Sequence, residues 1–241
     1  MPYPIGRSVH SLLLLACCIS GLGAQPTPAP EQKTTVIARL VPVHPEVAHK
    51  TESIRPSVIW LQPLRPADTQ LVTPANFTLM QKNKMFIPHL LVVPVGSSVA
   101  FPNADPFFHN VFSLFDGRRF DLGLYEAGST RSVVFSREGV SYIFCNIHSE
   151  MSAVVIALST PYYGIAGPEG EFHLKDVPAG EYELHVWVEG EKQSSLDRLS
   201  RRVHIAGESV DLGGITTNPT DRQQHLNKFG RPYEPDSHPI Y

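Results

Sequence analysis

Three side chains that bind soft metal ions stand three residues apart in the stretch "CNIHSEM", at Cys145, His148 and Met151. A thiolate, an imidazole and a thioether on one short turn can bring their donor atoms to a single point. The β-type runs on either side, "SYIFC" and "SAVVIAL", predict two strands joined by this turn. The spacing therefore predicts a metal-binding loop at one end of a β-sheet.

A fourth donor is expected from a distant strand end, and His109 in "DPFFHNVFS" supplies it. A strand over residues 99–101 and the turn "PNADP" precede it, and another β run follows. Two imidazoles, one thiolate and a weak axial methionine form the donor set of a blue-copper electron-transfer site. The sequence therefore predicts one copper ion held by His109, Cys145, His148 and Met151.

Taken singly, these residues have structural explanations as well. Met151 alone fits a core residue, and His109, beside two phenylalanines, fits a partly buried structural histidine. Asn110, which follows His109, fits a turn residue. The order, the spacing and the strand context agree only with the copper site, so we favour that interpretation.

The N-terminal stretch has the pattern of a secretory signal. Arg7 precedes an apolar run over 11–21 that is too short to span a bilayer. We expect residues 1–24 to be the signal peptide and 25–33 a linker, which makes the protein periplasmic or secreted. The second interpretation is a lipoprotein anchored at Cys17, after the poor lipobox "LLAC". No later apolar stretch is long enough for a membrane helix.

Cleavage of this signal changes the meaning of the remaining cysteine. The chain has three cysteines, and removal of Cys17 and Cys18 leaves Cys145 alone in an oxidising compartment. Such a thiol has no partner for an intramolecular disulfide and is prone to oxidation. It is either a buried inert thiol or a thiolate held by a metal, and its neighbours favour the metal.

Residues 76–158 resemble the cupredoxin family, which includes plastocyanin and amicyanin. The resemblance lies in "FIPHLLVVPVGSSVAFPNAD", in "HNV" and in the short amicyanin-type spacing C-x2-H-x2-M. It implies a Greek-key β-sandwich with one type 1 copper ion on the four ligands named above. It also implies that the Asn110 side chain ties the two ligand-bearing segments together. Phe144 departs from the family, which often has tyrosine before the cysteine.

A second resemblance follows the predicted copper loop. "GEFHLKDVPAGEYEL" resembles the carboxypeptidase regulatory-like module, a small transthyretin-like sandwich. "TTVIARLV" and "PSVIWLQPL" match the first two strands of that module. We therefore expect an all-β chain in which residues 34–64 plus 159–216 form a second β-sandwich, interrupted by the cupredoxin. Residues 217–241 form a polar tail expected to wrap the surface or to be disordered. This combination resembles bacterial proteins labelled methylamine-utilisation-like.

Other functional classes lack support in the sequence. A net charge of −3 gives no reason to expect nucleic-acid binding. G-x-S-x-G, P-loop and H-E-x-x-H motifs are absent, so hydrolytic and phosphate chemistry are not indicated. The single remaining cysteine excludes a dinuclear copper centre, and the lack of H-x-H pairs excludes a multicopper oxidase.

We expect an electron carrier, not an enzyme, that moves single electrons between redox partners. The alternatives are a copper-binding protein for delivery or storage, and a non-redox interaction module that has lost its metal. In the cupredoxin fold the histidine of the ligand loop, here His148, lies nearest the surface. Phe107, Phe108 and Ile147 around it are the expected docking surface for an unidentified redox partner.

Overall fold

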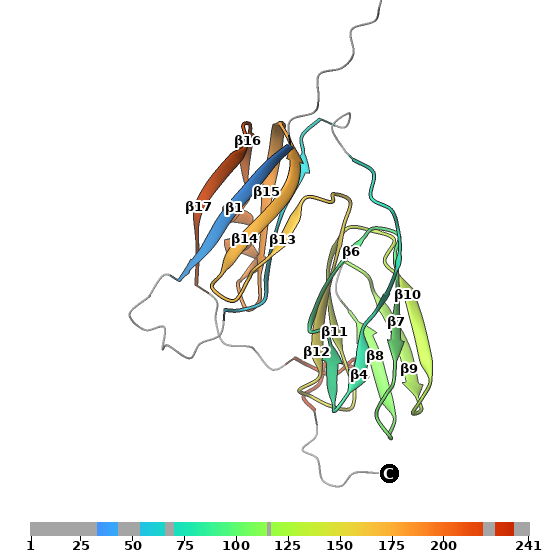
Figure 1. Cartoon of the computed structure of the whole chain (residues 1–241). Helices are drawn as coiled ribbons and strands as arrows, with labels where there is room; N and C mark the ends of the chain where they lie inside the picture. Colours follow the sequence, from blue (N-terminus) through green and yellow to red (C-terminus); the bar gives the residue numbers. More distant parts are fainter. Residues whose placement is uncertain (1–32, 43–53, 66–69, 115–116, 219–224, 234–241) are drawn as a thin grey trace, which may run out of the picture. The chain divides into compact units, whose positions relative to one another are not determined.

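The computed structural model describes residues 33–42, 54–65, 70–114, 117–218 and 225–233 (Figure 1). The predictions of a signal peptide, of a lipoprotein anchor at Cys17 and of nearly all of the linker fall outside these residues. Seventeen strands and one seven-residue helix, α1 (Gln193–Leu199), form the regular structure of the described residues. The predicted all-β class is therefore confirmed. Within the described residues, no helix is long and apolar enough to cross a bilayer.

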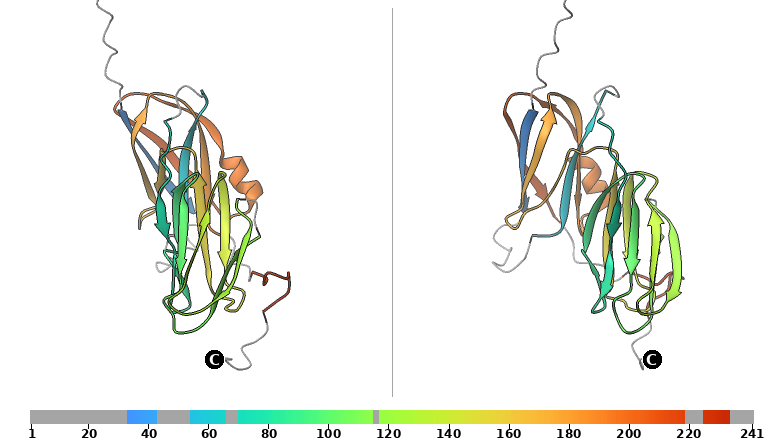
Figure 2. Two further views of the ribbon diagram at one scale, coloured as in Figure 1. Left: turned by 90° about the vertical axis from the view of Figure 1, so that its right-hand side faces the viewer. Right: turned by 45° about the vertical axis from the view of Figure 1, so that its right-hand side comes forward.

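The first sandwich contains the predicted metal ligands. One layer is a five-stranded sheet in the order β6-β12-β11-β8-β9, and the other is a three-stranded sheet in the order β10-β7-β3, with β4 and β5 as a separate hairpin (Figure 2). The strands are β3 (Asn76–Thr78), β4 (Met80–Lys82), β5 (Met85–Ile87), β6 (Leu90–Pro94), β7 (Ser98–Pro102), β8 (His109–Ser113), β9 (Phe120–Tyr125), β10 (Thr130–Val134), β11 (Gly139–Phe144) and β12 (Ser152–Leu158).

The second sandwich consists of the sheets β14-β1-β17 and β13-β2-β15-β16. Its strands are β1 (Lys33–Pro42), β2 (Ser57–Pro63), β13 (Tyr163–Ile165), β14 (Glu171–Pro178), β15 (Gly180–Val188), β16 (Arg201–Ile205) and β17 (Ser209–Thr217). In Figure 1, β1 lies between β14 and β17. Strand β2 pairs with β13 and β15. The two strands that precede the first sandwich in the sequence thus pair with strands that follow it.

Strand pairing in the first sandwich places the predicted ligands at one end of its larger sheet. β11 and β12 are antiparallel with Phe144 opposite Ser152, so Cys145 and Met151 lie just beyond the paired ends. β8 begins at His109 itself, and all five of its residues are buried. Cys145 and Met151 belong to one hydrophobic core cluster with residues of β6, β7, β8 and β11. Burial of each large apolar side chain of this cluster contributes about 1.5–3 kcal/mol. The predicted ligand loop, residues 145–151, therefore packs on a stable hydrophobic core.

Candidate metal centre

His109, Cys145 and His148 converge at the end of the first sandwich. Their potential ligand atoms all lie within 4.8 Å of one another, and all three residues are buried. The Sγ atom of Cys145 lies 3.8 Å from Nδ1 of His109 and 3.6 Å from Nδ1 of His148. The centroids of the two imidazole rings are 5.0 Å apart. Both histidines therefore turn the same ring nitrogen toward the sulfur, which is the arrangement a shared metal ion requires.

The ligand loop is a tight turn closed by its own backbone. The N–H of Cys145 donates to the carbonyl of Met151 at 3.3 Å, and the N–H of Met151 donates to the carbonyl of His148 at 3.2 Å. The Met151 side chain is fully buried in the same core cluster as Cys145. The structure thus brings together the predicted ligand atoms of His109, Cys145 and His148 and keeps Met151 in the core cluster that contains Cys145.

The protonation of the site suits a cation that binds thiolate. Burial raises the pKa of the Cys145 thiol, although the backbone N–H groups of Asn110, Ile147 and His148 point at the sulfur and oppose this rise. Burial also lowers the pKa of His109, which leaves the imidazole neutral. A neutral His109 and a sulfur that already faces three N–H donors need only a cation to become a thiolate site. This soft, dry donor set fits copper.

Asp105 was not predicted from the sequence, yet it contacts the predicted ligand His109 directly. Its Oδ2 lies 2.8 Å from Nε2 of His109, and the carboxylate is only 5% exposed. The backbone N–H groups of Asn83 and Lys84 donate to it at 2.6 and 3.0 Å. Burial raises the pKa of Asp105, but the bonds from Lys84, His109 and Asn83 outweigh it and the pKa is lowered.

The Asp105 carboxylate therefore fixes the tautomer of His109. It holds the ring proton at Nε2, which leaves the lone pair of Nδ1 free on the side of Cys145. An acid four residues before a histidine, in "DPFFH", is the sequence signal that could have indicated this bond.

Asn110 lies in the site but makes a different bond from the one expected. Its Nδ2 donates to Oδ1 of Asp121 on β9 at 2.8 Å, and its Oδ1 has no hydrogen-bond partner among the described residues. We expected this side chain to tie the two ligand-bearing segments together, and its amide bonds to Asp121 of β9 rather than to residues 145–151. The direct link to Cys145 comes from the backbone N–H of Asn110, which points at Sγ.

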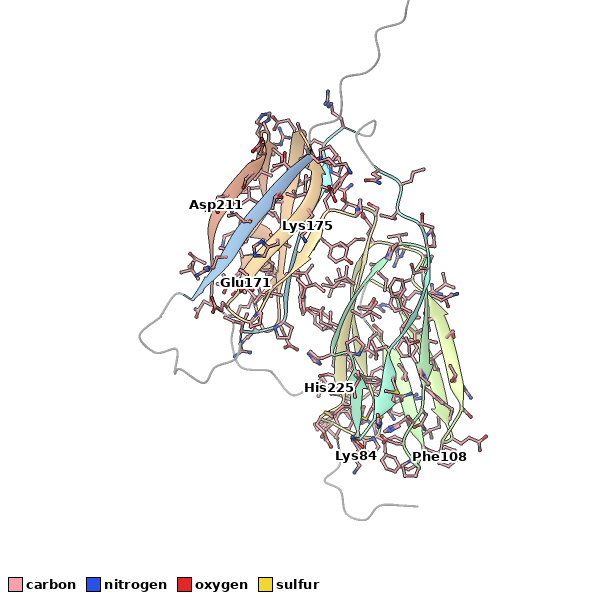
Figure 3. The ribbon with its side chains drawn as sticks, viewed as in Figure 1. Lys84, Phe108, Glu171, Lys175, Asp211 and His225 are labelled. Carbon is pink, nitrogen blue, oxygen red and sulfur yellow. The ribbon has the colours of Figure 1, made fainter. Side chains whose placement is uncertain are left out.

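The residues expected to form the docking surface differ in exposure. Phe108 and Ile147 are 57% and 41% exposed. Phe107 is partly buried, with its ring centroid 5.2 Å from that of His109 and 5.7 Å from that of His148. Figure 3 shows Phe108 at the same end of the first sandwich as Lys84, whose Nζ lies 5.8 Å from the Phe107 ring centroid. Phe107 thus packs on both imidazoles, while Phe108 and Ile147 face solvent.

Comparison with known proteins gives weak similarities. No family model and no curated protein sequence matches the chain. Among solved structures, a copper-containing nitrite reductase (NirK) from Thermus scotoductus SA-01 is 24% identical with a TM-score of 0.34, over 40% of this chain and 27% of its own. A purple cupredoxin from Nitrosopumilus maritimus is 24% identical with a TM-score of 0.31, over 34% of this chain and 98% of its own.

A reduced amicyanin mutant, P94F, is 20% identical with a TM-score of 0.32, over 34% of this chain and 82% of its own. The match thus spans about a quarter of the length of the nitrite reductase. The case for copper rests on the donor geometry of the chain itself.

Proposed function

We propose that this chain is a copper protein that carries single electrons, with His109, Cys145, His148 and Met151 as the ligands of one type 1 copper ion. The observation that carries the proposal is the convergence of two imidazole Nδ1 atoms on the Sγ of a fully buried cysteine. When bound there, copper supplies a one-electron couple between Cu(II) and Cu(I), which this donor set serves in both states.

The residues of the chain supply the conditions for electron transfer. Asp105 holds the proton on the far nitrogen of His109 and so fixes the orientation of that ring. The core around Cys145 and Met151 excludes water and restricts movement of the ligands. Three backbone N–H groups stabilise the charge on the sulfur. A site held in this way needs little rearrangement when an electron arrives or leaves.

Burial of the ligands favours an electron carrier over a protein for copper delivery or storage. Cys145 and His109 are fully buried, and His148 is 7% exposed. Transfer of the ion itself would require these donors to be reached by a partner, whereas transfer of an electron requires only a close approach. An interaction module without metal would have no need for the convergent donor set.

The surface around His148 is the proposed contact for the redox partner. Phe108 and Ile147 are exposed. Phe107 packs directly on the imidazoles of His109 and His148. A transient electron-transfer contact needs less than about 1,200 Å² of buried surface. A small apolar area of this kind fits such a partner.

The domain and localisation assignments belong to the same proposal. We assign residues 76–158 to a cupredoxin-like domain and residues 34–64 plus 159–216 to a discontinuous second domain of the carboxypeptidase regulatory-like type. The pairing of β1 and β2 with strands of the second sandwich supports the discontinuity. The pattern of the first 24 residues supports export to the periplasm or beyond.

Copper loading followed by redox cycling tests the function. Purified protein is titrated with Cu(II), its metal content is measured, and the loaded protein is reduced with ascorbate and reoxidised with ferricyanide. We expect one copper per chain, one electron per copper and full reversibility over several cycles. The control His173→Ala, at an exposed histidine of β14, leaves both values unchanged. Copper that binds without reversible reduction would favour storage instead.

A further inference from the structure

The C-terminal segment, residues 225–233, is a compact turn with its own internal bonds. The N–H of Asn227 donates to the carbonyl of Arg231 at 2.9 Å, and the N–H of Gly230 donates to the carbonyl of Asn227 at 2.9 Å. Oδ1 of Asn227 accepts from the N–H groups of Phe229 and Arg231 at 2.9 and 3.1 Å. These bonds give the C-terminal segment a defined shape with which it can contact the rest of the chain.

The first contact of the C-terminal segment is with the thiolate residue of the proposed site. Oη of Tyr233 donates to the carbonyl of Cys145 at 2.7 Å and lies 3.1 Å from Nδ1 of His225. The N–H of Cys145 is already bonded to the carbonyl of Met151. Tyr233 therefore completes the restraint of Cys145, because both backbone polar groups of this residue are now fixed.

The second contact joins the two parts of the chain that carry the ligands. The N–H of Lys228 donates to Oδ1 of Asn146, and its Nζ lies 2.8 Å from Oδ2 of Asp121. The other oxygen of Asp121 accepts from Asn110. Asn146 directly follows one proposed ligand and Asn110 directly follows another. A single residue of the C-terminal segment thus links the ligand loop to β8.

The third contact is an aromatic stack beside the ligand loop. The His225 ring stacks on Phe144 with centroids 4.0 Å apart and 26° between the planes. The Tyr233 ring meets His225 edge-on, with centroids 5.1 Å apart. Phe144 is the last residue of β11, immediately before Cys145, and is only 9% exposed. The stack fixes the strand end from which the ligand loop begins.

We propose that the C-terminal segment is a strap that positions the copper ligands, with Tyr233 and Lys228 as its positioning residues. The inference rests on the proposed function and gives the segment a part in it. Neither residue belongs to the donor set. They act on the Cys145 carbonyl, on Asn146 and on Asp121, and through these groups they hold the thiolate and the loop in the geometry of the site.

Tyr233→Phe in the full-length chain tests the strap, because it removes one hydroxyl and keeps the aromatic stack. Tyr163→Phe, at an exposed tyrosine of β13, is the matched control. Backbone hydrogen exchange is measured on metal-free protein, and the copper-loaded protein is followed by its visible spectrum and by copper loss to a chelator. Loss of one hydrogen bond predicts exchange in residues 145–151 that is roughly fivefold faster in Tyr233→Phe.

Copper loss should accelerate by a similar factor, with a shift of the visible band, while Tyr163→Phe matches the wild type. The role assigned to the strap would be overturned if hydrogen exchange, the visible spectrum and the rate of copper loss all stay at wild-type values in Tyr233→Phe. If Tyr233→Phe does not fold, Lys228→Met takes its place, because it keeps the backbone bond to Asn146 and removes the bond to Asp121 together with the contact of the ammonium group with the Phe229 ring. If wild-type protein binds no copper, the proposed function fails, and hydrogen exchange of the metal-free protein still decides whether the segment restrains the loop.

Discussion

Replacement of Asp105 by asparagine should raise the reduction potential of the copper-loaded protein. The Asp105 carboxylate is 5% exposed, bonds to Nε2 of His109 at 2.8 Å and stays ionised because its pKa is lowered. A buried negative charge stabilises Cu(II) more than Cu(I). Asp105→Asn removes this charge at almost constant volume, so it disfavours the oxidised state.

The size of the effect follows from Coulomb's law. One imidazole ring separates the Asp105 carboxylate from the nitrogen that faces Cys145, so the carboxylate and a copper ion bound at that nitrogen would lie roughly 7 Å apart. An effective dielectric constant of about 20 then gives an interaction of about 2 kcal/mol between the two charges. For a one-electron couple this corresponds to a rise on the order of 100 mV.

The same substitution should also destabilise the fold. The N–H groups of Asn83 and Lys84 both donate to the carboxylate, and asparagine offers only one acceptor oxygen. A buried group left without its partner costs about 1–3 kcal/mol. Chemical unfolding of metal-free protein measures this cost separately from the potential.

Protein-film voltammetry of wild type and Asp105→Asn measures the potential directly. The control is Glu138→Gln, which removes a carboxylate next to the opposite end of β11, roughly 20 Å away at about 3.3 Å per residue. Asp105→Asn should raise the potential, and Glu138→Gln should leave it within a few millivolts. A copper-loaded Asp105→Asn protein with an unchanged or lower potential would refute the role assigned to this carboxylate.

Three further predictions concern the proposed axial ligand, the proposed partner surface and the dependence of stability on acid pH. Met151→Gln should retain copper with a lower potential, because a harder oxygen donor favours Cu(II); an unchanged voltammogram would remove Met151 from the ligand set. Ile147→Ser should slow electron exchange with the physiological partner in stopped-flow measurements and leave the visible spectrum unchanged. Phe107→Ser should slow exchange and also alter the spectrum, because Phe107 contacts both imidazoles. Exchange rates equal to the wild-type rate in both variants would place docking elsewhere. Burial raises the pKa of Asp121, but the bonds from Lys228, Asn110 and Gly123 lower it overall. The stabilisation that Asp121 contributes is therefore present above its unfolded pKa and lost as the pH falls through its folded pKa. The free energy of unfolding of Asp121→Asn should depend less steeply on pH below about 4 than that of the wild type.

The convergence of His109, Cys145 and His148 could be predicted because most of its information is local. Cys145, His148 and Met151 lie within one turn, and the β-type runs on either side fix the strand ends from which the turn begins. His109 required only that a second strand start nearby in the same sheet. Asp105 was within reach of the same reasoning, since it stands one short turn before His109.

The partners of Asn110 and of the C-terminal segment could not be predicted in this way. Asp121 reaches Asn110 because the register of β8 and β9 shifts between Asn110 and Phe112, which is a detail of backbone geometry. Tyr233 lies 88 residues from Cys145 in the sequence. The predicted tail over residues 217–241 is polar and rich in proline, which indicates a surface tail and gives no information about what the tail covers.

The visible spectrum of the purified protein after addition of Cu(II) tests the central claim most directly. If Cys145 holds copper together with His109 and His148, thiolate-to-copper charge transfer should give an intense visible band that ascorbate bleaches and ferricyanide restores. Cys145→Ser should lack this band and keep the β-sheet circular dichroism of the wild type. A wild-type protein that stays colourless with Cu(II) bound, or a Cys145→Ser protein that keeps the band, would contradict the assignment.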